Sequence, residues 1–165
     1  MVILGIDPGI AIVGYGIIEY KNNKFRVIDY GAVTTNANTP TDQRLALVYK
    51  GIDILIKNYN IDEVAIEELF FNKNVKTAIT VAQARGVIML ACTHNNKPIY
   101  EYTPLQVKQG VVGYGRAQKM QVQQMVTSLL KLKEIPKPDD TADALAIAVC
   151  HAHANRLGKT LKNFK

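Results

Sequence analysis

Met1-Val-Ile-Leu-Gly-Ile-Asp-Pro-Gly9 is a short apolar run that carries one carboxylate and then stops. Apolar residues on both sides of Leu4 are typical of a strand that is buried on both faces. The Pro-Gly pair that follows Asp7 breaks such a strand directly after the acid. An ionised carboxylate at the end of a buried strand is costly unless a cation or several hydrogen-bond donors meet it. Asp7 therefore indicates a functional site at the end of a predicted strand.

The totals of the sequence bound the class of protein. The chain of 165 residues has the size of one ordinary domain, and a net charge of +6 with a pI near 9.3 favours a polyanionic partner. No apolar run approaches the roughly 20 residues of a membrane span, and no signal-peptide pattern is visible. Two distant cysteines in such a chain suggest reduced thiols. We expect a cytoplasmic protein without membrane association, with one domain over residues 1–158 and a basic, flexible tail over 159–165.

Hydrophobic periodicity and turn residues predict three strands followed by alternating helices and strands. The predicted strands cover Val2–Asp7, 13–20, 25–34, Glu63–Glu67 and 97–102. The predicted helices cover a segment that begins within 39–42 and continues to 56, then Val75–His94, 103–110, 119–132 and 139–157. This order predicts an α/β protein with a five-stranded mixed sheet flanked by helices. The crossover through the first helix places the Glu63–Glu67 strand beside the first strand.

Four carboxylates stand at matching places in these elements. Asp7 and Glu67 end neighbouring strands, at the carboxyl edge where α/β sheets hold their sites. Asp140 and Asp143 are three residues apart and share one helix face, and two prolines before them put the pair in the first helical turn. The apolar segment behind them can pack on the sheet. We therefore expect this turn to face the strand ends that carry Asp7 and Glu67.

Clustered carboxylates without a basic residue among them repel one another, and some would take up protons. A divalent metal removes the conflict, and carboxylates with waters and substrate phosphate suit Mg²⁺, with Mn²⁺ as the alternative. Two such ions roughly 4 Å apart activate a water and stabilise the leaving oxygen in phosphodiester cleavage. Each motif alone has a simpler interpretation, namely a helix N-cap, a solvated strand end or a common turn. Their occurrence together and in this order favours a metal-dependent site.

The sequence also resembles the RuvC family of bacterial Holliday-junction resolvases over essentially its whole length. The matches occur in order and at similar spacing, which makes the resemblance highly specific. They are Ile3-Leu-Gly-Ile-Asp-Pro-Gly9, Gly14-Tyr-Gly16, Ala65-Ile-Glu67, Phe70, Lys73-Asn74, Gln83-Ala-Arg-Gly86, Gln106-Val-Lys-Gln109, Val111-Val-Gly113 and Asp140-Thr-Ala-Asp-Ala-Leu-Ala-Ile147.

The resemblance implies an RNase H-like fold, a homodimer, and Mg²⁺-dependent nicking of two opposed strands at a four-way DNA junction, in homologous recombination and repair. It implies a partnership with the RuvA–RuvB branch-migration machinery. By family position Asp7, Glu67, Asp140 and Asp143 are the catalytic, metal-binding acids. Two departures from the family pattern are an apolar run over residues 10–13 and Glu68, where a neutral residue is expected.

Six residues are candidates for contact with DNA: Phe70, Lys73, Arg85, Lys108, Arg116 and Lys119. The basic ones would contact phosphates, which provides affinity without sequence choice. Lys108 and Lys119 match basic residues that lie near the site in RuvC-like proteins, where a lysine stabilises the developing charge on the phosphate. Phe70 is either a lid on the core or a wedge that stacks on an unpaired base, and the resemblance favours the wedge. For Lys76 a solvated side chain is the preferred interpretation.

The helix predicted over Val75–His94 is apolar on more than one side, and Ala84 and Gly86 allow close approach. Paired nicks call for two sites related by a two-fold axis, so this helix is our first candidate for the dimer contact. A non-catalytic junction-binding module would need a missing acid, and none is missing. A YqgF-like RNA-processing nuclease shares the fold and the acids. An ATP-handling fold of the actin and sugar-kinase class needs a second domain for which the chain is short.

Overall fold

The computed structural model describes residues 1–69 and 75–162, with the backbone alone for 75–77 and 156–162. In this part of the chain five strands and five helices follow the predicted order. The strands are β1 Val2–Asp7, β2 Ile12–Lys21, β3 Lys24–Thr34, β4 Glu63–Glu67 and β5 Ile99–Tyr102. The helices are α1 Thr41–Asn58, α2 Val75–His94, α3 Pro104–Val112, α4 Lys119–Leu129 and α5 Asp139–Lys162.

Two helix ends differ from the prediction. Helix α4 ends at Leu129 rather than at 132, and two residues later Lys131 adopts a φ of 54°, in the left-handed region that does not continue a helix. Helix α5 continues to Lys162, beyond the predicted end at 157. The first residues of the predicted tail are therefore helical, and residues 163–165 lie outside the described chain.

The strands form one mixed sheet in the order β3-β2-β1-β4-β5. Strands β1, β2 and β3 pair antiparallel, whereas β4 pairs parallel to both β1 and β5. Asn22 and Asn23, between β2 and β3, have φ values of 52° and 60°, as a tight hairpin turn requires. The crossover through α1 brings β4 beside β1, as predicted from the sequence.

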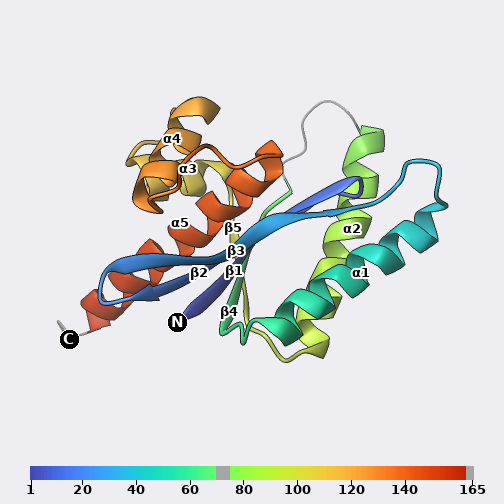
Figure 1. Cartoon of the computed structure of the whole chain (residues 1–165), viewed down its shortest axis with the longest axis horizontal. Helices are drawn as coiled ribbons and strands as arrows, with labels where there is room; N and C mark the ends of the chain where they lie inside the picture. The colour runs from blue at the N-terminus through green and yellow to red at the C-terminus, as the bar shows by residue number, and fades with distance from the viewer. Residues whose placement is uncertain (70–74, 163–165) are drawn as a thin grey trace.

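Helices cover both faces of the sheet: α1 and α2 lie on one side and α3, α4 and α5 on the other (Figure 1). Side chains alternate between the faces along each strand. Leu4 and Ile6 of β1 join the core beneath α1 and α2, while Ile3 joins the core beneath α5. The same alternation directs Gly5 and Asp7 towards α5. In β4 it directs Ala65 and Glu67 to that face.

Helix α5 approaches β1 and β2 very closely. A side chain on Gly5 would overlap the carbonyl oxygen of Ala144, and one on Gly14 would overlap the carbonyl oxygen of Asp140. Only glycine fits at such distances, because any Cβ would force the helix away from the sheet.

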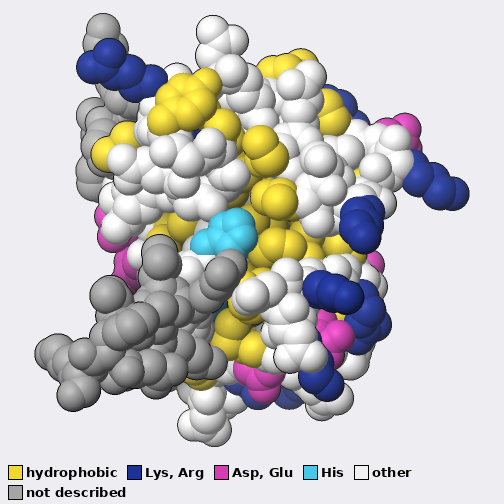
Figure 2. All heavy atoms as spheres, turned by 90° about the vertical axis from the view of Figure 1, so that its left-hand side faces the viewer, with side chains coloured by type: hydrophobic (Ala, Val, Ile, Leu, Met, Phe, Trp, Pro, Cys, Tyr) yellow, Lys and Arg dark blue, Asp and Glu magenta, His cyan; other side chains and the backbone are white. Residues whose placement is uncertain are grey.

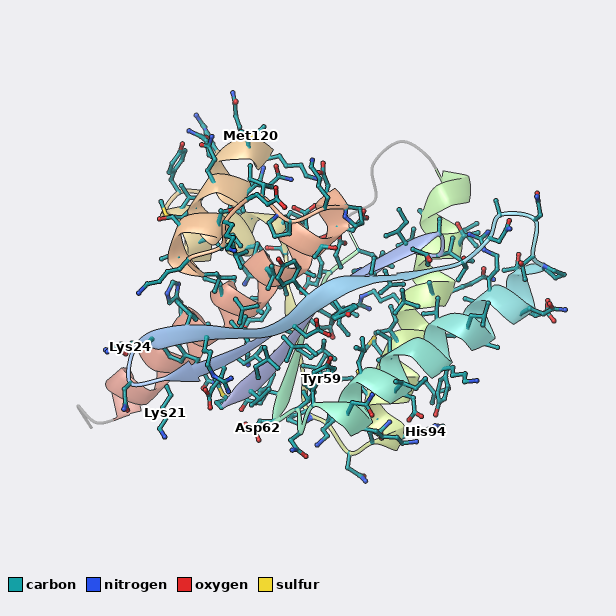
Figure 3. All side chains as sticks on the ribbon, viewed as in Figure 1. Lys21, Lys24, Tyr59, Asp62, His94 and Met120 are labelled. Carbon is teal, nitrogen blue, oxygen red and sulfur yellow. The ribbon has the colours of Figure 1, made fainter. Side chains whose placement is uncertain are left out.

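Asp62 lies at the end of β1 opposite to Asp7. Its carboxylate accepts a hydrogen bond from the backbone N–H of Val2 at 2.7 Å (Figure 3).

Cys92 and Cys150 are buried free thiols. Among the residues that the structure describes, no helix combines the length and the apolar character that a crossing of a membrane requires.

Candidate active site

The register of the sheet brings Asp7 and Glu67 together. Strands β1 and β4 run parallel, and their pairing ends at Ile6 and Ile66. The two acids come one residue further along each strand and point to the same face, towards α5. Adjacent strands lie about 4.8 Å apart. Two carboxylates from segments that are 60 residues apart in the sequence therefore meet at the carboxyl edge of the sheet.

The first turn of α5 adds Asp140 and Asp143 to this edge. Gly14 is the register partner of Asp7, and the backbone of Asp140 packs directly on Gly14. The buried Thr141 donates a hydrogen bond from Oγ1 to the carbonyl oxygen of Gly31 at 3.0 Å, which ties the turn to β3. The four acids predicted from the sequence are thus brought into one electrostatic neighbourhood.

Burial and mutual repulsion raise the pKa values of these acids. Burial raises the pKa of Asp7 to about 8, with further contributions from the charges of Glu67, Asp143 and Asp140. Burial and the charge of Asp143 raise the pKa of Glu67 to about 7. Burial also raises the pKa of Asp143, although Lys119 opposes the shift. The site is therefore short of positive charge near neutral pH.

Lys119, at the start of α4, supplies part of that charge. Its ammonium lies 2.8 Å from a carboxylate oxygen of Asp143 and 3.5 Å from one of Asp139. Within the described residues, no three acidic, histidine or cysteine side chains converge into a ready-made metal cage. An open arrangement suits Mg²⁺, which is commonly held by one or two carboxylates together with waters and substrate phosphates. A donor set made only of carboxylate oxygens also fits Mn²⁺.

A cleft of about 230 Å³ opens beside the acids. Glu67 and Asp143 line one part of it, and Lys108 and Lys119 contribute two ammonium groups. The rest of the wall is apolar and comes from α3, α4 and α5, namely Pro104, Val107, Val122 and Ala146. The cleft therefore offers both carboxylates for a cation and cations for a phosphate.

The other predicted DNA contacts have different surroundings. Arg116 is exposed in the connection between α3 and α4. Arg85 is mostly buried and paired with Glu101. Phe70 and Lys73 lie outside the described residues, as does the side chain of Lys76. On the face of the molecule in Figure 2, lysine and arginine side chains gather along one flank among acidic ones rather than as a continuous patch.

Sequence reasoning missed a polar cluster at the opposite end of β4 from Glu67. His151 of α5 contacts Glu63 at 2.6 Å through Nε2 and the hydroxyl of Tyr102 at 2.7 Å through Nδ1. Asn155 donates a further hydrogen bond to Glu63 at 2.7 Å. Burial lowers the pKa of His151, although Glu63 opposes the shift. The one available signal was spacing, because Glu63 and Glu67 share a strand face and His151 follows Asp143 by eight residues.

A five-stranded mixed sheet in this order, with carboxylates from two central strands and from the last helix at one edge, defines the RNase H-like class of nucleases. The model of the family described as "Crossover junction endodeoxyribonuclease RuvC" matches residues 3–151. The chain belongs to the RuvC family of crossover junction endodeoxyribonucleases.

Individual relatives agree with this assignment. The chain is 80% identical to crossover junction endodeoxyribonuclease RuvC of Clostridioides difficile strain 630, over 99% of this chain and 96% of the relative. Its structure is similar to that of T. thermophilus RuvC in complex with a Holliday junction substrate, with a TM-score of 0.91, 38% identity and 96% coverage of both chains. The yeast mitochondrial Holliday junction resolvase Ydc2 shares the fold, at 14% identity, a TM-score of 0.73 and coverage of 98% of this chain and 83% of that one. The predicted fold class and family are confirmed.

Proposed function

We propose that this protein resolves four-way DNA junctions by metal-dependent, paired and symmetric nicking of phosphodiester bonds, in homologous recombination and repair. One observation carries the proposal. In a chain of the RuvC family, carboxylates from β1, β4 and α5 meet at one sheet edge, beside a cleft that also holds two lysines. A junction-resolving enzyme acts on chromosomal DNA, so we propose the bacterial cytoplasm as its location.

Asp7, Glu67, Asp140 and Asp143 are the proposed metal ligands and catalytic acids. We propose Mg²⁺ as the ion, with Mn²⁺ as a substitute and two ions per site. When bound, such ions lower the pKa of a water and stabilise the leaving oxygen. The raised pKa values of Asp7 and Glu67 mean that a cation and protons compete for the same carboxylates. Metal affinity should therefore increase as the pH rises towards 8.

Lys108 and Lys119 are the proposed cationic partners of the substrate. Both line the cleft beside Glu67 and Asp143, so that a phosphate in the cleft would lie within reach of their ammonium groups. A preorganised ammonium stabilises the charge that develops on a phosphate during cleavage. Lys119 is held by Asp143 and Asp139 and can exchange these partners for a phosphate. Arg116 and Lys73 are proposed as phosphate contacts, and Phe70 as a base-stacking wedge.

We propose α2 as part of the contact between two protomers. Ile79, Gln83, Gly86 and Leu90 are spaced along one face of this helix, and all four are exposed. The Ile79 and Leu90 residues are 55% and 47% accessible, and the Gly86 position has open space around it. An exposed apolar face with a central glycine suits close helix packing about a two-fold axis. Sedimentation of an Ile79→Asp variant, expected to be monomeric, tests this assignment. The RuvA–RuvB complex remains a proposed further partner.

The test is a cleavage assay on a synthetic four-way junction, beside linear duplex of the same sequence and a structured RNA. Wild type, Asp7→Asn and the control Asp62→Asn are compared in Mg²⁺ and in EDTA. Asp62 lies at the opposite end of β1 from Asp7. We expect symmetric nicks on the junction alone, dependent on metal and on Asp7, with junction binding retained by Asp7→Asn. Full cleavage by Asp7→Asn would contradict the proposal. Cleavage of the RNA alone would instead favour a YqgF-like RNA nuclease, and binding without any cleavage a non-catalytic module.

A further inference from the structure

Arg85 makes three contacts that hold it against the edge of the sheet. Its Nε–H donates a hydrogen bond to the carbonyl oxygen of Glu67 at 3.1 Å. One terminal nitrogen forms an ion pair with Glu101, and the other contacts the sulfur of Met89 at 3.4 Å. The side chain of Arg85 is only 15% exposed. An arginine with these partners is already engaged within the protein.

The contact with Glu67 holds one particular peptide group. Strand pairing ends here, because β1 pairs with β4 up to Ile66 and β4 pairs with β5 up to Glu67. The peptide between Glu67 and Glu68 is nevertheless held at both of its ends. Arg85 donates a hydrogen bond to the carbonyl oxygen of Glu67. The backbone N–H of Glu68 donates to the carbonyl oxygen of Tyr102 at 2.9 Å. Two opposed hydrogen bonds fix the plane of this peptide and with it the backbone of Glu67.

Glu101 explains why an arginine is stable at this position. Glu101 is the register partner of Ile66 and, like Ile66, points to the face of α1 and α2, from which Arg85 approaches. A poorly hydrated guanidinium is costly without a paired charge. The planar guanidinium can bind a carboxylate and a carbonyl oxygen at the same time, which the single ammonium of lysine does less well. Arg85 thus connects α2 to the ends of β4 and β5.

We propose that Arg85 is a positioning residue for Glu67, with Glu101 as its anchor, rather than a contact for DNA phosphate. The inference rests on the proposed role of Glu67 as a metal ligand. The carboxylate of Glu67 projects towards α5, while Arg85 holds the backbone of the same residue from the α2 side of the sheet. Loss of Arg85 lets the Glu67–Glu68 peptide rotate and displaces the carboxylate from the other acids.

The test separates positioning from DNA binding with three variants and a matched control. Arg85→Gln removes the charge and the planar set of guanidinium donors, and Arg85→Lys keeps the charge alone. Glu101→Gln removes the anchoring charge while keeping a polar side chain. The control is Arg26→Gln, which breaks an exposed ion pair with Glu19 in the β2–β3 hairpin. For each protein we would measure junction affinity in EDTA, the single-turnover cleavage rate at saturating junction as a function of Mg²⁺, and hydrogen exchange of the Glu68 amide.

We expect Arg85→Gln to lower the saturated cleavage rate by about 10–100-fold, the range found for outer partners of metal ligands. Its Mg²⁺ midpoint should rise, its junction affinity should change less than about twofold, and its Glu68 amide should exchange faster. Arg85→Lys should not restore the rate. The side chain of Glu101 is 43% exposed, so Glu101→Gln should disturb folding less than Arg85→Gln does. It should show a smaller loss of the same kind, whereas Arg26→Gln should show no loss.

Two outcomes would overturn the inference. In the first, Arg85→Gln binds the junction more weakly but cleaves it at the normal saturated rate, Arg85→Lys restores the binding, and Glu101→Gln strengthens it. Arg85 would then be a phosphate contact. An unchanged rate, affinity and Glu68 exchange in Arg85→Gln would leave it without a positioning role. Failure of the proposed function looks different, because then wild type does not cleave the junction or Glu67→Gln cleaves as wild type does. The Glu68 exchange still tests the Arg85 contact in that case.

Discussion

The interface between α5 and the sheet holds partly buried carboxylates at both of its ends. Hydrogen-bond donors surround the carboxylate at one end, whereas other carboxylates surround those at the other end. At one end Glu63 accepts hydrogen bonds from His151 and Asn155 at 2.6 and 2.7 Å. At the other end Asp7 and Glu67 face further carboxylates, and burial together with this repulsion raises their pKa values to about 8 and 7. Glu63 and Glu67 stand on the same face of the same strand.

The difference distinguishes a structural polar cluster from a functional one. A neutral His151 with its proton on Nε2 donates to Glu63 and accepts from the hydroxyl of Tyr102, so that each group has a partner. A buried network that is satisfied in this way stabilises one packing of the helix on the sheet. Clustered like charges destabilise the fold, and such clusters occur where chemistry needs them. Substitutions at the two ends should therefore have opposite consequences.

The largest effect should come from Asp7→Asn. We expect cleavage to fall by on the order of 10³-fold, as when a catalytic group is removed. In EDTA at a pH above 8 the melting temperature should rise, because an ionised carboxylate repelled by its neighbours is replaced by a neutral group of similar shape. Thermal unfolding and junction cleavage of the same preparations provide the check. A clear loss of stability in EDTA would show that Asp7 is a structural residue.

His151→Ala should have the converse effect. Loss of a hydrogen bond to a charged group costs about 1.5–3 kcal/mol of unfolding free energy, and here Glu63 loses a donor. Cleavage per folded molecule should change little at a temperature well below the melting point. Urea unfolding measures the stability, with His94→Ala, which removes an exposed contact to Tyr49, as the control. Equal stability of the two variants would mean that the cluster does not hold α5 on the sheet.

Gly14→Ala tests how the two ends depend on the same close packing. The added methyl group would overlap the backbone of Asp140 and push the first turn of α5 away from β2. Overpacking of this kind costs about 1–3 kcal/mol, and the displaced Asp140 and Asp143 should lower the cleavage rate. The control is Gln43→Ala at an exposed position of α1, which should leave stability and cleavage almost unchanged. A Gly14→Ala variant with normal stability and cleavage would contradict this packing.

The last prediction concerns the dependence of stability on pH. Asp7 and Glu67 bind protons more tightly in the folded chain than in the unfolded one, since their pKa values rise from 3.8 and 4.5 to about 8 and 7. Stability in EDTA should therefore be greatest at low pH within this window and decline as the pH rises from about 4 towards 8. We expect the melting temperature in EDTA to decline over this range, although Lys119 opposes both pKa shifts. Saturating Mg²⁺ and the Asp7→Asn variant should each flatten the curve. A wild-type stability that rises across this range would contradict the raised pKa values.

Much of this molecule was predictable from local patterns in the sequence. The apolar run that ends at Asp7, the hairpin turn, and the helix between the third and fourth strands predicted a mixed sheet in which the fourth strand lies beside the first. They also predicted that Asp7 and Glu67 end neighbouring strands. The family resemblance added the roles of the four acids. Those roles, the DNA contacts and the domain boundary at 158 stay predictions, and the cleavage and binding experiments test the first two.

The interaction partners of individual side chains were not predictable in this way. Arg85 looks like a free cation in the sequence, and only the folded chain pairs it with Glu101, 16 residues away, and with the backbone of Glu67. Residue spacing alone did not show that His151 would meet Glu63, 88 residues earlier. The strands, and the sheet face to which each side chain points, follow from short-range periodicity, which each segment carries in its own residues. Which polar groups meet depends on how closely α2 and α5 pack against the sheet, and that distance is decided by the whole tertiary structure.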